Sequence, residues 1–246
     1  DLMPSDVTGH AVYDLHTEQF KLRKGPVFTH LLLADEINRA PAKTQAALLE
    51  AMQERQVTLE GEALPIGQPF MVLATQNPIE QEGTYPLPEA ELDRFMLKVR
   101  MDYPDAQQEL EMVREVTRSS RADMLAVHPL RTVLQAEDVL QLQQVASDLA
   151  LDEQVLDYAV RLARATRSWP GLAIGAGPRA SIDLVRGARA RALLRGGGVV
   201  TPGGIKGCAL AVLRHRVRIA PELDIDGLEV DQVLRQLLDQ IPAPRQ

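Results

Sequence analysis

Short apolar runs and polar segments alternate through the first hundred residues of the chain. Residues 31–34 and 70–75 are apolar runs of the kind that forms strands covered on both faces of a parallel sheet. Between them, residues 42–55 carry leucine and methionine at helical spacing, and Pro41 suits the first turn of a helix. The pattern predicts two parallel strands separated by a helix.

Two further segments alternate between polar and apolar residues. Residues 13–28 do so up to Gly25-Pro26, which predicts a short strand or hairpin. Residues 56–66 alternate around Gly61, which predicts a β-hairpin whose turn uses the backbone freedom of glycine. After a loop and a short helix, residues 96–101 are predicted to form a third strand.

From residue 105 onward the periodicity becomes almost wholly helical. We therefore predict two domains: an α/β domain over residues 1–104 and an all-α domain over residues 105–246. The segments with the clearest helical pattern are residues 107–116, 136–147, 152–166 and 178–194.

Polar side chains follow both apolar runs. Asp35 and Glu36 come directly after the first run, and Asn77 follows the second. In open α/β sheets, ligands bind just outside the carboxyl ends of the strands, so these side chains would meet at one edge. Asp35 would hold Mg²⁺, Glu36 would orient or deprotonate a water, and Asn77 would position that water or contact a terminal phosphate. The alternative is a strand that surfaces into an acidic loop.

Two arginines complete the candidate chemistry, because phosphoryl transfer develops negative charge that cations stabilise. Arg94 stands just before the predicted third strand; its alternative reading is an ordinary ion pair with a neighbouring acid. Arg179 stands at the start of a predicted helix, where the helix dipole disfavours a cation unless an anion is close. Its alternative reading is a solvated arginine.

Composition narrows the class of protein. The net charge of −7 argues against a nucleic-acid-binding surface over the whole molecule. Cys208 is the only cysteine, which excludes an intrachain disulfide and indicates a reducing, cytoplasmic compartment. No apolar run is long enough to cross a bilayer. The phosphate-binding pattern GxxxxGK[ST] occurs nowhere in the 246 residues.

Two long segments are similar to one known family. "LLLADEINRAPAKTQAALLEAMQERQVT" (31–58) and "LATQNPIEQEGTYPLPEAELDRF" (73–95) closely resemble the MoxR family of AAA+ ATPases, of the clade with an insert in helix 2. The similarity is dense over residues 1–104. It continues more loosely through "GPRAS" (177–181) and "VLRHR" (212–216).

The resemblance implies a fold, cofactors and residue roles. The fold would be an AAA+ P-loop NTPase core with a parallel sheet, followed by an all-α lid. ATP and Mg²⁺ would be the cofactors. Asp35, as metal ligand, and Glu36 look like the Walker B pair, and Asn77 looks like sensor 1. Arg179 looks like sensor 2 on the lid, and Arg94 looks like the arginine finger that reaches a neighbouring subunit.

The resemblance also implies a biological role. Family members couple Mg²⁺-dependent ATP hydrolysis to chaperone-like remodelling or to the maturation of metalloproteins and complexes. They form homo-oligomeric rings, expected here as a hexamer of the full-length form, and often act with a partner that carries a von Willebrand factor A domain. The open alternatives are a magnesium-chelatase-like ATPase subunit and a non-hydrolysing assembly module.

The family's Walker A loop and its strand would belong upstream of Asp1. We therefore expect residues 1–246 alone to lack the phosphate cradle and to bind ATP weakly. A truncated chain and a degenerate site both fit this departure.

Overall fold

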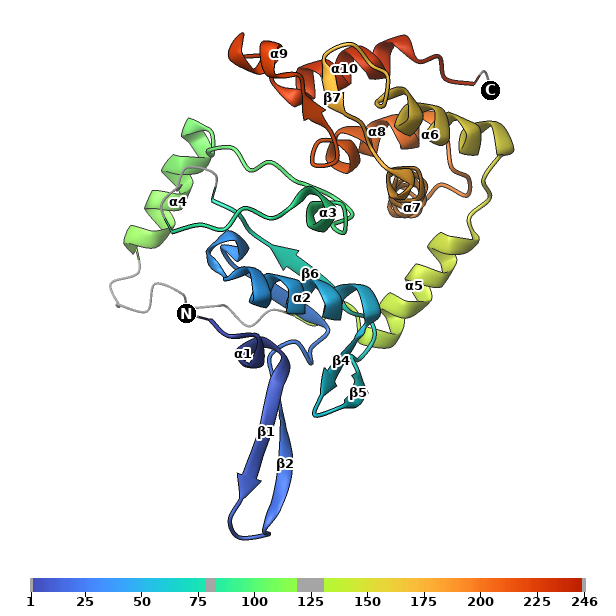
Figure 1. Cartoon of the computed structure of the whole chain (residues 1–246). Helices are drawn as coiled ribbons and strands as arrows, with labels where there is room; N and C mark the ends of the chain where they lie inside the picture. The colour runs from blue at the N-terminus through green and yellow to red at the C-terminus, as the bar shows by residue number, and fades with distance from the viewer. Residues whose placement is uncertain (1, 78–82, 119–130, 245–246) are drawn as a thin grey trace.

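The structure is a computed structural model that describes residues 2–77, 83–118 and 131–244 (Figure 1). Its first part combines short helices with strand pairs. In chain order, the elements are α1 (Pro4–Thr8), β1 (Gly9–Asp14), β2 (Gln19–Lys24), β3 (Leu31–Ala34), a 3-10 helix (Ile37–Arg39), α2 (Ala42–Glu54), β4 (Gln56–Leu59), β5 (Glu62–Pro65), β6 (Met71–Ala74) and α3 (Glu89–Leu92).

The second part is mainly helical. Its elements are α4 (Ala106–Arg118), α5 (Ala136–Asp148), α6 (Glu153–Ala165), β7 (Leu172–Ile174), α7 (Pro178–Leu194), α8 (Pro202–Leu213), β8 (Arg218–Ile219), α9 (Pro221–Ile225) and α10 (Val230–Gln240). The short antiparallel pair of β7 and β8 corrects the prediction that this part is all-α. Two strands of two or three residues are too short to leave a period in the sequence. None of the described helices is long and apolar enough to span a membrane.

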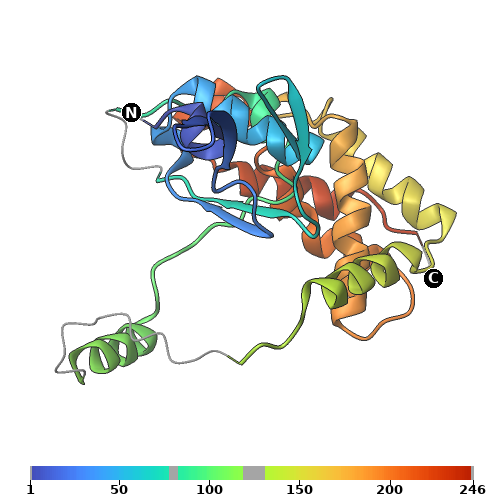
Figure 2. The ribbon, with the colours of Figure 1, turned by 90° about the horizontal axis from the view of Figure 1, so that it is seen from below.

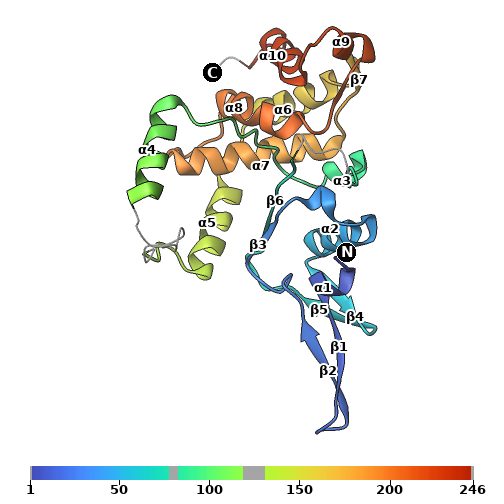
Figure 3. The same cartoon turned by 90° about the vertical axis from the view of Figure 1, so that its left-hand side faces the viewer.

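The two apolar runs pair as predicted. Strands β3 and β6 are parallel neighbours, with Leu31 opposite Met71 and Ala34 opposite Ala74. The segment predicted as a short strand or hairpin is part of the β1–β2 hairpin, which begins earlier, at Gly9. The hairpin predicted around Gly61 is confirmed, since β4 pairs with β5 and the φ of Gly61 is +83°. The β1–β2 hairpin projects from the body of the molecule in two perpendicular views (Figures 1 and 3).

Buried apolar side chains gather in two separate cores. The first joins α2, the β4–β5 hairpin and the inner face of β3 and β6; its most buried members include Val27, Leu49, Ala51 and Ile66. The second joins α6, α7, α8 and α10 around Tyr158, Leu162, Leu184, Ile205 and Leu234. The boundary after residue 104 stays a prediction, because residues 96–148 contribute no buried apolar side chain in the described ranges.

The expectation that β3 and β6 are covered on both faces was wrong for the described residues. Leu31, Leu33, Met71 and Leu73 are 44–62% exposed, although the same strands bury their alternate side chains partly. The described elements pack against only one face, where Leu32 meets the cluster around α2. Strands alternate their side chains between two faces, so the second face stays open to solvent.

The predicted third strand at residues 96–101 was also wrong. The segment belongs to no strand and bonds to the lid instead of to a sheet. The amide of Lys98 donates to the carbonyl of Ala211 (2.8 Å), and Arg214 Nη1 donates to the carbonyl of Lys98 (3.3 Å). Its polar backbone groups therefore bond to the end of α8, which a pattern of apolar residues does not reveal. Figure 2 shows the long path of this connection to α4.

His215 lies where this segment meets the lid. Its side chain is 8% exposed, and its Nε2 lies 2.8 Å from the carbonyl of Phe95, so the neutral ring donates through Nε2. The other nitrogen, Nδ1, is buried without a hydrogen-bond partner among the described residues. Burial lowers the pKa of His215 from 6.5 to about 4, because the charged imidazolium would lose its hydration in this buried position.

We predict that His215 makes folding less stable in acid. Above pH 6.5 the imidazole is neutral in both states. Between pH 6.5 and 4 only the unfolded state takes up the proton, so the free energy of unfolding falls, by up to about 3 kcal/mol. The His215→Gln variant, whose amide can donate the same bond without titrating, should lose less stability over this range. Urea denaturation of the parent and of His215→Gln at pH 6.5 and at pH 4 measures how much stability each protein loses. Equal losses in the two proteins would contradict the prediction.

Candidate functional site

The carboxyl ends of β3 and β6 meet around Thr75. Since Ala34 lies opposite Ala74, the next residues, Asp35 and Thr75, are neighbours. Thr75 Oγ1 donates to Asp35 Oδ1 at 2.5 Å and accepts from the amide of Glu36 at 2.8 Å. The amide of Ile37 donates to the carbonyl of Thr75 at 3.0 Å. Thr75 was not among the residues predicted from the sequence, and the signal that identifies it is its register opposite Asp35.

Glu36 has an unusual backbone. Its φ of 48° and ψ of 51° place it in the left-handed region, which costs a residue with a side chain about 1 kcal/mol or more. The hydrogen bonds of Thr75 to two successive amides hold this turn in place. Glu36 Oε2 also forms an ion pair with Arg39 Nε at 2.9 Å. The two carboxylates thus leave the strand end in different directions, each with its own partner.

Asn77 lies two residues beyond Thr75 and is half-buried. It therefore follows the carboxyl end of β6, at the same edge of the sheet as Asp35 and Glu36, which follow β3. Residues 78–82, which carry part of the motif that resembles MoxR proteins, lie outside the described residues.

Arg179 stands at a second location, where the lid meets the core. It is the second residue of α7, as predicted, and its Nη1 lies 3.1 Å from Asp93 Oδ2, just after α3. In Figures 1 and 3, α3 lies beside α7. No hydrogen bond or ion pair among the described residues joins Asp35 or Glu36 to Arg179. The structure thus separates the predicted site residues into a strand-end group and a core–lid group.

Asp93 also contacts a buried arginine of the lid. Arg216 Nε lies 2.9 Å from Asp93 Oδ1, as an ion pair whose N–H is not directed at the oxygen. Its Nη2 donates to Asp183 Oδ2 at 2.6 Å and to the carbonyl of Phe95 at 2.8 Å. The Arg216 side chain is only 1% exposed. Asp93 therefore contacts two arginines of the lid, the partly exposed Arg179 and the buried Arg216.

Arg94 follows Asp93 directly and is half-buried. Its amide donates to the carbonyl of Glu91 at 3.1 Å. Among the described residues, the side chain of Arg94 forms no ion pair, so the alternative of an ordinary pair with a neighbouring acid has no support within the subunit.

The loop before Arg179 is held by the end of α6. The buried Thr166 hydroxyl accepts from the amide of Ala176 at 2.8 Å, and Arg167 Nε donates to the carbonyl of the same residue at 2.9 Å. A Cβ on Gly175 would lie 2.4 Å from the Cα of Arg167, so only glycine allows this approach. These contacts fix the start of α7 and with it the position of Arg179.

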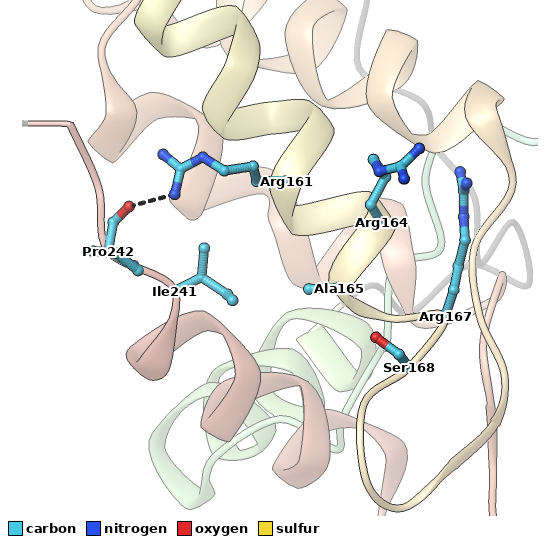
Figure 4. Close-up of a pocket in the computed structure, with 7 residues that line it drawn as sticks. All are labelled: Arg161, Arg164, Ala165, Arg167, Ser168, Ile241 and Pro242. Carbon is cyan, nitrogen blue, oxygen red and sulfur yellow. Dashed lines mark hydrogen bonds between the residues drawn. The ribbon is translucent and has the colours of Figure 1, made fainter.

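A cavity of about 470 Å³ lies on the lid beside the same end of α6 (Figure 4). It contains none of the predicted site residues. Arg161 points toward Pro242 and donates to its carbonyl, whereas Arg164 and Arg167 point to the other side. Arginines near a helix carboxyl end stabilise the helix dipole, which accounts for this cluster without a ligand.

Comparisons with known proteins agree with this architecture. Residues 1–97 match the model of the ATPase family associated with various cellular activities (AAA), and residues 164–237 match the AAA lid domain. The chain is 41% identical over 249 residues to the uncharacterized protein YeaC of Bacillus subtilis, covering 100% of this chain and 75% of the relative. It is 40% identical over 258 residues to the chaperone MoxR1 of Mycobacterium tuberculosis, and the match covers 100% of this chain and 66% of the relative. The chain belongs to the MoxR family of AAA ATPases.

A solved structure has the same fold. The crystal structure of a candidate ATPase from Cytophaga hutchinsonii superposes with a TM-score of 0.89 at 38% identity, covering 100% of this chain and 76% of that one. A magnesium-chelatase 38 kDa subunit of Acidiphilium rubrum is more distant, at 30% identity over 229 residues and with 61% of the relative covered. The chain thus spans about two thirds to three quarters of the MoxR-type relatives. The predicted fold, an α/β AAA domain followed by a helical lid, is confirmed.

We predict that the buried ion pair of Arg216 with Asp183 contributes far more to the free energy of unfolding than an exposed ion pair does. Arg216→Met leaves Asp183 buried without its main partner and should lower the free energy of unfolding by about 3 kcal/mol or more. The matched control is Arg218→Met, because Arg218 pairs with Glu89 at a position where both side chains are half or more exposed. The control should cost less than about 1 kcal/mol. Urea denaturation decides, and similar losses for both variants would contradict the role of Arg216.

Proposed function

We propose that this protein is a magnesium-dependent ATPase and that hydrolysis takes place at the strand ends that carry Asp35 and Glu36. The observation that carries the proposal is the pair of carboxylates held beside Thr75, at the edge of a parallel sheet where open α/β proteins bind ligands. Membership of the AAA ATPase family supports ATP as the nucleotide.

Asp35 is suited to Mg²⁺, which prefers one or two carboxylates together with phosphate and water oxygens. Its Oδ1 accepts from Thr75, which leaves Oδ2 for a cation. No cluster of three or more metal-ligating His, Cys, Asp or Glu side chains occurs in the described ranges. The bound ion would neutralise charge on the phosphates.

The protein's own groups would carry out the chemistry. Glu36 orients a water and accepts its proton as the oxygen attacks the terminal phosphorus and the bond to ADP breaks. Asn77 positions this water or contacts the terminal phosphate. Arg179, held by Asp93 in this structure, would exchange that carboxylate for the terminal phosphate. Arg94 would act on the site of a neighbouring subunit.

The wider role is proposed by analogy with the family. The protein would form a homo-oligomeric ring, a hexamer in its full-length form, and couple hydrolysis to chaperone-like remodelling or to maturation of a metalloprotein or complex. The relative named as a chaperone supports this direction. A partner with a von Willebrand factor A domain and a cytoplasmic location remain predictions.

Two alternative functions fit the same fold less well. A magnesium-chelatase-like role is disfavoured, because the chelatase subunit is less similar than the MoxR-type relatives. A non-hydrolysing assembly module would keep the fold but release no phosphate. The joint presence of Glu36, Asn77 and Arg179 favours the hydrolytic reading.

We predict that Glu36→Gln in the full-length protein keeps ATP binding but lowers steady-state phosphate release by about a hundredfold or more. The amide fills the same space but cannot accept the proton of the water. Glu50→Gln is the matched control, because Glu50 is exposed on α2 and should leave turnover unchanged. Near-normal turnover in the Glu36 variant would remove this residue from the mechanism.

We also predict that Arg94 acts between subunits. A head-to-tail ring places one subunit's surface against the next subunit's site. Arg94→Ala alone should lower turnover by about a thousandfold. In a random equal mixture with Glu36→Gln subunits, roughly a quarter of the interfaces pair two intact halves, so activity should return in part. Co-assembly is checked by pull-down of differently tagged subunits, and an assembled mixture without recovery would contradict action in trans.

A further inference from the structure

Thr75 is the residue that both Asp35 and the Glu36 amide contact. Its hydroxyl lies 2.5 Å from Asp35 Oδ1 and 2.8 Å from the amide nitrogen of Glu36. A carboxylate can only accept a hydrogen bond and an amide N–H can only donate one. The chemistry therefore fixes the direction of both bonds: the Thr75 proton points to Asp35, and a lone pair of Oγ1 faces Glu36.

We propose that Thr75 is a positioning residue for ATP hydrolysis, which sets the rotamer of Asp35 and the backbone of Glu36 at the same time. The inference rests on the proposed function. It goes beyond that function because it assigns the arrangement of the two carboxylates to one hydroxyl on the neighbouring strand.

The hydroxyl has two consequences for the site. It occupies Oδ1 of Asp35, so that Oδ2 is the oxygen presented to a cation. It also holds the first amide of the turn in which Glu36 adopts φ 48°, a conformation that persists only where the surroundings enforce it. Without the hydroxyl, Asp35 would rotate and Glu36 would relax, and the water would lose its orientation relative to the phosphate.

The Thr75→Val substitution separates a positioning role of the hydroxyl from a purely structural role of the residue, because valine preserves the shape of the side chain. Thr75 is exposed, and valine has nearly the same shape and favours strands as strongly. The carbonyl of Thr75 would keep its bond with the amide of Ile37 in any variant, and its amide would keep its bond with Ala34. Thr75→Val therefore removes the two hydroxyl bonds and little else.

The test compares Thr75→Val, Thr75→Ser and Thr29→Val in the full-length protein. Thr29→Val is the matched control, since Thr29 lies just before the opposite end of β3. Thr75→Val should lower kcat between about tenfold and a hundredfold, with KM for magnesium ATP changed by less than about threefold. Thr75→Ser restores the hydroxyl and should keep kcat within about threefold of the parent, and Thr29→Val should behave like the parent.

A second readout does not depend on turnover. Amide hydrogen exchange at single-residue resolution should accelerate at Glu36 in Thr75→Val by about tenfold, while exchange within β6 is unchanged. The proposal is overturned if Thr75→Val keeps the parent's kcat, or if Thr75→Ser loses as much activity as Thr75→Val. A parent protein without magnesium-dependent ATPase activity would contradict the proposed function itself. In that case exchange decides the role of Thr75, and an unchanged Glu36 amide overturns it.

Discussion

The register in which β3 and β6 pair is the constraint on which the candidate site depends. It places Ala34 opposite Ala74, so that Asp35 and Thr75 leave the sheet side by side. A slip by one residue would turn alternate side chains to the opposite face and separate the two. The partly buried inner face, packed on the α2 cluster, holds the strands in this register. The chemistry at the strand ends thus follows from packing further along the same strands.

A buried group of charged side chains around Arg216 connects the lid to the core. Arg216 and Asp183 belong to the lid, whereas Asp93 and Phe95 belong to the chain that leaves the core. Breaking such a pair leaves a buried charge without compensation, so the group resists rearrangement. The contact of Arg179 with Asp93 is partly exposed and therefore weaker. The boundary between core and lid thus combines a buried ion pair with a partly exposed one.

The sequence predicted those parts that depend on periodicity and turn chemistry. The strands at 31–34 and 71–74, both hairpins and the helix with Arg179 near its start follow from local patterns. The failures concern partners that are distant in the sequence. Residues 96–101 look like a strand, yet their backbone groups bond to the end of α8 more than a hundred residues away. Thr75 was missed because a hydroxyl at a strand end gains its meaning only from the register with Asp35. The role of Arg179 at a phosphate stays a prediction; its contact with Asp93, 86 residues earlier, could not be read from local pattern.

A crystal structure of the full-length protein with Mg²⁺ and a non-hydrolysable ATP analogue tests the proposed site most directly. The cation should lie on Asp35 Oδ2, with Oδ1 still bonded to Thr75, and Arg179 should have left Asp93 for the terminal phosphate. A nucleotide bound away from Asp35 and Glu36, with Arg179 still paired to Asp93, would contradict the proposed site.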